Sequence, residues 1–194
     1  MPEPLTDVTT DGRGRCGWAG AAPEYVDYHD DEWGRPLHGV TAMFERLSLE
    51  GFQSGLSWLV ILRKRPAFRA AFAGFDPERV AGFGDTDVQR LLADPGIVRN
   101  RAKIEATVNN ARAVLELDQP LDELLWSFAP DPGTHRRPAT LAEVPATSPE
   151  STAMARALKR KGLRFVGPTT CYALMQAAGL VDDHVQGCWR AAMT

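Results

Sequence analysis

Helix-forming patterns dominate this sequence and constrain its fold more than any other feature. Asp76 and Ser148 are each followed by proline, which combines a capping side chain with the residue favoured at the first helical position. Thr41 is expected to cap a third helix. No alternating β-strand pattern of comparable strength is present, so the sequence predicts an all-α protein. The clearest amphipathic stretch, residues 98–117, carries apolar residues at helical spacing, namely Ile104, Val108, Ala111 and Leu115.

Segments rich in proline and glycine suggest how the chain is divided. Residues 1–14 lack hydrophobic periodicity, and we expect a flexible leader there. Prolines and glycine between residues 128 and 148 separate a central helical block from a C-terminal one. We therefore expect one two-lobed helical domain over residues 15–190, followed by a short tail over residues 191–194. A length of 194 residues with 44% hydrophobic content suffices for such a core.

The composition also bears on location and partners. No apolar run approaches the roughly 20 residues that a membrane span needs, and the first residues lack the apolar core of a signal peptide, so we expect a soluble cytoplasmic protein. The formal net charge of −3 argues against indiscriminate binding of polyanions. Three cysteines without a secretion signal favour thiols or metal ligands over disulfides.

Two cysteine–histidine pairs have spacings compatible with zinc binding. His184 and Cys188 are close enough in sequence for one helical turn or a tight loop to direct both side chains at one ion. Cys16 and His29 form a looser pair. Cys2His2 is a standard structural zinc set, but the spacing alone favours buried free cysteines and ordinary histidines.

Aromatic residues are concentrated near the start of the chain, where three of the five tryptophans occur before residue 59. Flat side chains can stack on a nucleobase drawn out of a duplex, and packing in an aromatic core is the alternative. The string LEGFQSGLSW at 49–58 adds Glu50, a lone acid between apolar and glycine residues, and is typical of a shaped site. The clustered aromatic residues are Trp18, Tyr25, Tyr28, Trp33 and Trp58.

The segment RFVGPTTC at 164–171 has an apolar approach, a glycine turn and the start of a new helix. This order suits a helix-hairpin-helix, in which backbone N–H groups at the turn hold a DNA phosphate. Gly167 and Thr169 are therefore candidate DNA contacts.

A set of motifs covering residues 15–189 resembles the DNA-3-methyladenine glycosylase I family of the helix-hairpin-helix DNA glycosylase superfamily. The motifs are RCGW at 15–18, YHDDEWG at 28–34, LEGFQSGLSW at 49–58, GIVRNRAKI at 96–104, FVGPTTCYALMQAAGLVDDH at 165–184 and GC at 187–188. The resemblance implies an all-α, two-lobed fold with a structural zinc site joining the N- and C-terminal segments. It assigns the zinc ligands to Cys16, His29, His184 and Cys188.

The resemblance also implies roles for the remaining candidate residues. It makes the aromatic cluster a base pocket with Glu50 as the acid that recognises the modified adenine, and it matches Gln53 and Leu56 to residues that fill the gap left in the duplex. Asp182 stands where the superfamily keeps a catalytic aspartate. Thr169 stands where bifunctional relatives carry a Schiff-base lysine, which implies no lyase activity.

One departure from the family pattern is Phe52, where a polar residue is usual, and we expect it to alter the DNA-facing loop. Taken together, the resemblance implies a monomeric, monofunctional enzyme of base-excision repair. It would flip out 3-methyladenine from alkylated double-stranded DNA and remove it by hydrolysis, with zinc as its structural cofactor. The alternatives are a preference for another alkylated base such as 3-methylguanine, a zinc-stapled module that binds lesions without excising them, and a purely structural helical scaffold.

Overall fold

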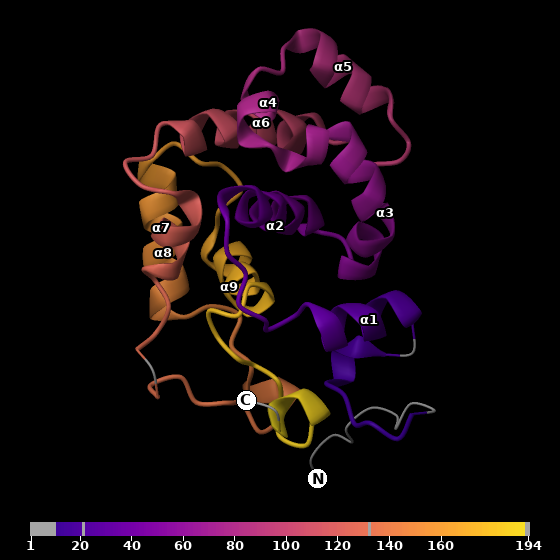
Figure 1. Ribbon diagram of the computed structural model, residues 1–194, viewed down its shortest axis with the longest axis vertical. Coiled ribbons are helices and arrows are strands. Elements are labelled where there is room, and N and C mark those ends of the chain that lie inside the picture. Colours follow the sequence, from indigo (N-terminus) through magenta and orange to yellow (C-terminus); the bar gives the residue numbers. More distant parts are fainter. Residues whose placement is uncertain (1–10, 21, 132, 193–194) are drawn as a thin grey trace.

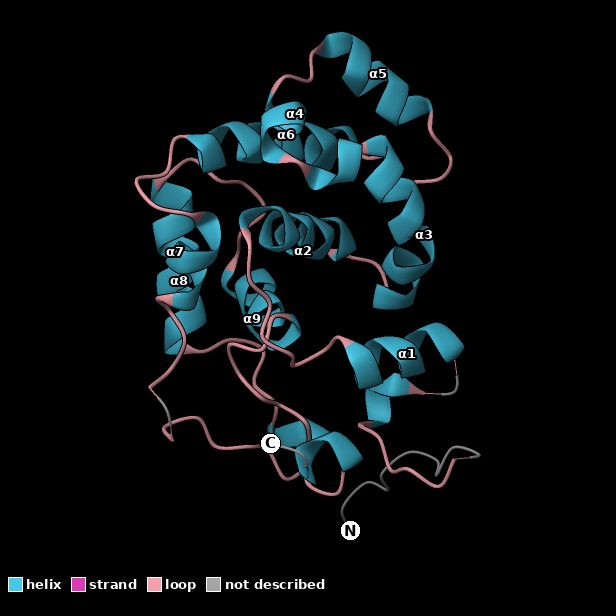
Figure 2. Ribbon diagram, in the orientation of Figure 1, coloured by secondary structure: helices cyan, strands magenta, loops and turns pink. Residues whose placement is uncertain are grey.

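The computed structural model describes residues 11–20, 22–131 and 133–192, and every element within them is helical (Figures 1 and 2). This confirms the predicted all-α class. Residues 1–10 of the expected leader and residues 193–194 of the expected tail lie outside the described residues. The α-helices are α1 (Pro23–Asp31), α2 (Val40–Gln53), α3 (Trp58–Ala71), α4 (Pro77–Ala81), α5 (Asp85–Ala93), α6 (Arg101–Leu115), α7 (Leu121–Trp126), α8 (Pro149–Arg160) and α9 (Pro168–Ala177), with short 3-10 turns η1 (Gly17–Ala19), η2 (Ala73–Phe75), η3 (Leu141–Glu143) and η4 (Trp189–Ala192).

Two of the predicted helix starts are confirmed by their capping bonds. The Asp76 carboxylate accepts from the backbone N–H groups that open α4, at 2.9 and 3.5 Å. Ser148 and Ser151 exchange bonds of 3.1 and 2.8 Å at the start of α8. Each bond satisfies a donor that the first helical turn cannot pair internally.

The predicted cap at Thr41 is wrong, because α2 begins at Val40 and Thr41 already lies inside it. Gly39 precedes the helix with a φ of 92°, a backbone conformation that glycine adopts without strain. Its N–H donates to the Asp122 carboxylate at 2.7 Å, which anchors the entry to α2 from α7.

Helix α2 runs through the centre of the fold, with α6 above it and α9 below it in the view of Figure 1. A cluster of phenylalanines buries its apolar face. Phe52 is 1% exposed, and its ring centroid lies 4.7 Å from that of Phe68 and 5.7 Å from that of Phe72. Phe52 is therefore a core residue near the end of α2, directly before the expected DNA-facing loop.

Segments from the two ends of the described chain meet beside α1 (Figure 1). The backbone N–H of Trp189 donates to the Gly14 carbonyl at 2.9 Å, and the Arg13 guanidinium lies 4.4 Å from the Trp189 ring centroid. Residues 13 and 14, which the sequence assigns to the leader, thus contact the C-terminal segment.

The segment between α1 and α2 lies directly against the end of α9. The Leu37 N–H donates to the Ala178 carbonyl at 3.0 Å. At Gly179, where φ is 75°, an added Cβ would lie 2.6 Å from the backbone of Arg35. Only glycine permits this approach, which holds the chain after α9 close to α1.

No helix among the described residues is long and apolar enough to cross a membrane.

Candidate active site and metal centre

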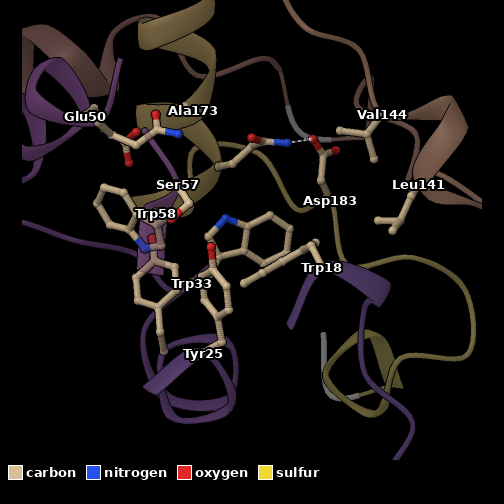
Figure 3. A pocket seen from close by; sticks show the side chains of 13 residues that line it. Trp18, Tyr25, Trp33, Glu50, Ser57, Trp58, Leu141, Val144, Ala173 and Asp183 are labelled. Atoms are coloured by element: carbon tan, nitrogen blue, oxygen red, sulfur yellow. Dashed lines mark hydrogen bonds between the residues drawn. The ribbon is translucent and has the colours of Figure 1, made fainter. Parts of the chain in front are cut away.

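A cavity of about 610 Å³ opens between α1, α2, α3 and α9 (Figure 3). Every residue of the predicted base pocket lines this cavity, and so does Gln53. In the view of Figure 3, Glu50 lies at the upper left and Asp183 at the upper right, with the labelled aromatic rings below them. The lining residues are Trp18, Tyr25, Tyr28, Trp33, Glu50, Gln53, Ser57, Trp58, Leu141, Val144, Ala173, Gln176 and Asp183.

The aromatic walls are fixed by contacts with one another. The Trp18 ring centroid lies 4.9 Å from that of Trp33 and 5.9 Å from that of Tyr25, in edge-to-face arrangements. Tyr28 and Trp58 are tilted against each other at 5.4 Å. Such packing holds rings in defined orientations, and the result is a rigid, flat-walled cavity suited to a planar ligand.

Glu50 places a carboxyl group in this apolar cavity. Its residue is 5% exposed. Burial raises the pKa of Glu50 to about 7, while the positive charge of Arg46 acts in the opposite direction. A carboxylate with little solvent around it interacts strongly with any cation that enters, so the cavity favours a flat, positively charged ligand.

Of the two neighbouring acids Asp182 and Asp183, only Asp183 lines the cavity. The Asp182 carboxylate forms an ion pair with Arg137. Asp183 is 1% exposed, and its Oδ2 accepts from the Tyr172 hydroxyl at 2.8 Å and from the Gln176 amide at 2.7 Å. Asp183 was not among the residues predicted from the sequence, because sequence alone does not show which of two adjacent carboxylates faces inward.

The two residues expected to fill a gap in DNA lie at the end of α2 and just after it. Leu56 is 38% exposed, and the Gln53 amide donates to its carbonyl at 3.2 Å. The buried Lys103 ammonium reaches across from α6 and donates to the carbonyls of Phe52 at 2.8 Å and Ser54 at 2.6 Å. Lys103 thereby fixes the backbone from which the Gln53–Leu56 turn projects.

The turn between α8 and α9 is held from α6. Asn110 accepts from the Arg164 N–H at 2.7 Å and donates to the Arg164 carbonyl at 2.9 Å. Gly167 precedes α9, and Thr169 is exposed in its first turn. The candidate DNA contacts therefore lie on a braced turn at a helix N-terminus.

Cys16, His29, His184 and Cys188 come together as one buried cluster, whose ligand atoms lie within 4.8 Å of one another. The Cys188 sulfur lies 3.4 Å from His29 Nε2 and 3.5 Å from His184 Nδ1. A tetrahedral zinc ion with bonds of about 2.3 Å to sulfur and about 2.0 Å to nitrogen needs sulfur–nitrogen edges of about 3.5 Å. The residues present thus fit zinc in both chemistry and spacing.

Hydrogen bonds orient both imidazoles toward the centre of the cluster. His29 Nδ1 lies 2.8 Å from Asp30 Oδ1, and His184 Nε2 lies 3.2 Å from the Trp33 carbonyl. In each ring the other nitrogen is left to face the cysteines. Metal-binding histidines are held in this way.

The three cysteines of the chain differ in the pKa of their thiol groups. A hydrogen bond from Cys16, supported by His184 and His29, lowers the pKa of Cys188, while the same contact and burial raise the pKa of Cys16. Cys171 is buried elsewhere, and burial raises its pKa to about 12. A thiolate is therefore favoured at Cys188, where a metal ion would require one.

An aromatic cavity with two buried acids, set in an all-helical fold, fits the class of enzymes that cleave the glycosidic bond of a base drawn out of DNA. The chain matches the family model of methyladenine glycosylase over residues 18–191, and it belongs to that family.

Known relatives narrow this class. The chain is 47% identical to DNA-3-methyladenine glycosylase 1 of Escherichia coli (strain K12) over 177 residues, which cover 90% of this chain and 95% of that protein. A crystal structure of 3-methyladenine DNA glycosylase I superposes with a TM-score of 0.87 at 45% identity, covering 90% of this chain and 98% of that one. The structure that describes 3-methyladenine recognition by 3-methyladenine DNA glycosylase I from Staphylococcus aureus superposes with a TM-score of 0.85 at 36% identity. The match covers 90% of this chain and 95% of that one.

Proposed function

We propose that this protein is a monofunctional DNA glycosylase that removes 3-methyladenine from alkylated double-stranded DNA. The observation that carries the proposal is the buried Glu50 carboxyl group in a cavity walled by aromatic rings. Family membership and the recognition of 3-methyladenine by the Staphylococcus aureus relative support it.

Recognition follows from the charge of the lesion. Methylation at N3 leaves adenine cationic, which weakens its glycosidic bond and makes it complementary to an anionic, aromatic pocket. The rings stack on the cation, and Glu50 accepts hydrogen bonds from the amino edge of the base. Neutral adenine gains less from the same site.

Hydrolysis then needs stabilisation of positive charge on the sugar as water attacks. A carboxylate close to the cavity supplies this electrostatically. Asp182 is the residue that matches the superfamily pattern, whereas Asp183 is the one that reaches the cavity. We assign the role to Asp183, and single-turnover excision should fall much further in Asp183→Asn than in Asp182→Asn.

DNA binding uses the surface around the cavity mouth. Leu56 and Gln53 enter the space vacated by the base, and N–H groups at Gly167 and Thr169 hold a phosphate in a helix-hairpin-helix formed by α8 and α9. Because Thr169 cannot form a Schiff base, the enzyme leaves the abasic strand intact. A single chain carries all of these parts, consistent with action as a monomer.

The Cys2His2 cluster holds a structural zinc ion that joins the two ends of the fold. Four protein ligands leave no open position, so the metal does not activate water. Mass spectrometry should find one zinc ion per native chain. The zinc should be lost in Cys16→Ala and retained in the matched control Cys171→Ala.

Incubation with methylated duplex DNA tests the proposed activity. We expect release of free 3-methyladenine, identified by chromatography and mass, with no strand cleavage. Release of another alkylated base in preference, such as 3-methylguanine, would reassign the specificity. Lesion binding without base release would show a non-catalytic module, and absence of both would refute the proposal.

A further inference from the structure

Arg46 is a buried cation directly behind the base pocket. It is 7% exposed and belongs to α2. One guanidinium nitrogen donates to the Tyr28 hydroxyl at 2.9 Å, and another donates to Glu32 at 3.2 Å. Arg46 does not line the cavity, so any effect on a ligand must pass through its neighbours.

The ion pair with Glu32 does not account for Arg46. Glu32 is already held by Arg65 in a two-point contact with both distances at 2.6 Å. A second arginine at this carboxylate leaves positive charge in excess. Arg46 is four residues before Glu50 on α2, and residues so spaced are neighbours on one helix face. The excess charge therefore lies beside the acid of the pocket.

We propose that Arg46 is a positioning residue for base recognition, which fixes the Tyr28 hydroxyl by a hydrogen bond and places a positive charge behind the Glu50 carboxylate. This inference rests on the proposed function and deepens it by naming what prepares the pocket for a cationic base.

The contact with Tyr28 determines how that hydroxyl is used. A guanidinium only donates, so it occupies an oxygen lone pair and leaves the phenolic proton to be donated elsewhere. The Arg46 guanidinium also lies 5.2 Å from the Tyr28 ring centroid and 6.0 Å from that of Trp58. Arg46 thus holds two walls of the cavity from behind.

The effect on Glu50 depends on all the charges packed around it. Tyr28 interacts with it from α1, and Asp183 lines the same cavity after α9. Glu32, which follows α1, is bound by Arg46 and by Arg65 of α3.

Burial moves the pKa of Glu50 upward to about 7, and Arg46 limits that rise. Without the Arg46 charge, burial would keep Glu50 protonated at higher pH. A neutral Glu50 loses its attraction for a cationic base.

The test compares Arg46→Gln, Arg46→Lys and the control Arg65→Gln in single-turnover excision of 3-methyladenine between pH 5.5 and 9. Gln keeps hydrogen bonds and removes the charge, whereas Lys keeps the charge. The wild type should lose activity on the acid side with a midpoint near pH 7. In Arg46→Gln the midpoint should rise by about one pH unit, the shift that loss of a nearby opposite charge produces. Arg46→Lys and Arg65→Gln should stay near the wild-type midpoint.

A titration of the Glu50 carboxyl carbon by NMR measures the same midpoint without catalysis, and Arg46→Met provides a second neutral variant if Arg46→Gln is unfolded. Equal midpoints in the wild type and the neutral variants would overturn the role of Arg46 and leave the proposed function intact. Absence of base release by the wild type at every pH would instead overturn the proposed function.

Discussion

At the residue scale, the burial of Glu50 has opposite consequences for stability and for recognition. Its folded pKa of about 7 lies above its ordinary value of 4.5, so the folded protein holds this proton more tightly than the unfolded chain does. Protonated Glu50 therefore makes its full contribution to the free energy of unfolding below pH 4.5, and this contribution is lost as the pH rises through 7. The carboxylate that suits a cationic base therefore weakens the fold at neutral pH.

Glu50→Gln should consequently be more stable than the wild type at pH 8 and nearly equal to it at pH 4.5. The shift corresponds to a gain of up to about 3 kcal/mol, at roughly 1.4 kcal/mol per pKa unit. Urea unfolding at both pH values measures it, with the exposed Glu116→Gln as the control that should show no such pH-dependent gain. The rate of 3-methyladenine excision should fall, and the preference for 3-methyladenine over adenine should become smaller. Equal stability gains at both pH values would contradict this view of Glu50.

The sequence identified Glu50 and the aromatic residues of the pocket but missed Asp183. The sequence motifs predicted these residues as the base pocket, and in the structure they all line one cavity. Asp182 and Asp183 differ only in where the backbone turn after α9 directs them. Long-range contacts, such as that of Asp182 with Arg137, decide this, and no local pattern records them.

At the scale of secondary-structure elements, the closeness of α9 to the α1–α2 connection depends on Gly179. Gly179→Ala should be destabilised by more than about 2 kcal/mol, because the new Cβ would meet the Arg35 backbone and a positive φ is strained for alanine. Gly162→Ala is the matched control. Its φ is 85° and an added Cβ meets nothing within 4 Å, so only the cost of a positive φ for alanine, about 1–2 kcal/mol, applies. Thermal unfolding distinguishes them, and equal losses would refute the clash.

The turn that follows α2 should depend on Lys103. Lys103→Met leaves the carbonyls of Phe52 and Ser54 without their ammonium donor, at a cost of about 1–3 kcal/mol, and releases the Gln53–Leu56 turn. We expect weaker binding of lesion-containing duplex with unchanged zinc content, measured by fluorescence anisotropy and metal analysis. The exposed Arg101→Met on the same helix serves as control, and unchanged affinity in Lys103→Met would contradict the bracing role.

Helix starts were predictable where the capping bond is local. Asp76 and Ser148 bond to N–H groups within three residues, so the sequence contains the whole interaction. The start of α2 was not predictable, because Gly39 is held by Asp122 from a helix far along the chain. The burial of Phe52 likewise depends on Phe68 and Phe72, which belong to another element.

For the whole molecule, the cysteine–histidine cluster unites segments that no local pattern could join. The sequence showed two separate pairs, and only the family motifs connected them. Its four ligands come from the residue before η1, from α1 and from the segment after α9. Asp30, next to the ligand His29, accepts hydrogen bonds from Arg15 at 2.6 Å and from the Trp189 indole N–H at 3.1 Å.

Removal of the metal by a chelator should therefore lower the melting temperature and loosen the base pocket, since Tyr28 and Asp183 are direct sequence neighbours of ligands. Differential scanning calorimetry measures the first effect, and quenching of tryptophan fluorescence by free 3-methyladenine measures the second. Restoring zinc should reverse both. A chelated protein with zinc removed and an unchanged melting temperature would contradict a structural role for the ion.

The position of the last two ligands also sets an order of events during synthesis. The described helices α1 to α9 are all synthesised before His184 and Cys188 are added to the chain. Asp183, which lines the same cavity as Glu50, comes out of the ribosome immediately before them. A nascent or prematurely terminated chain thus has aromatic walls without a closed pocket, and it becomes competent to hold a damaged base only when its final segment arrives.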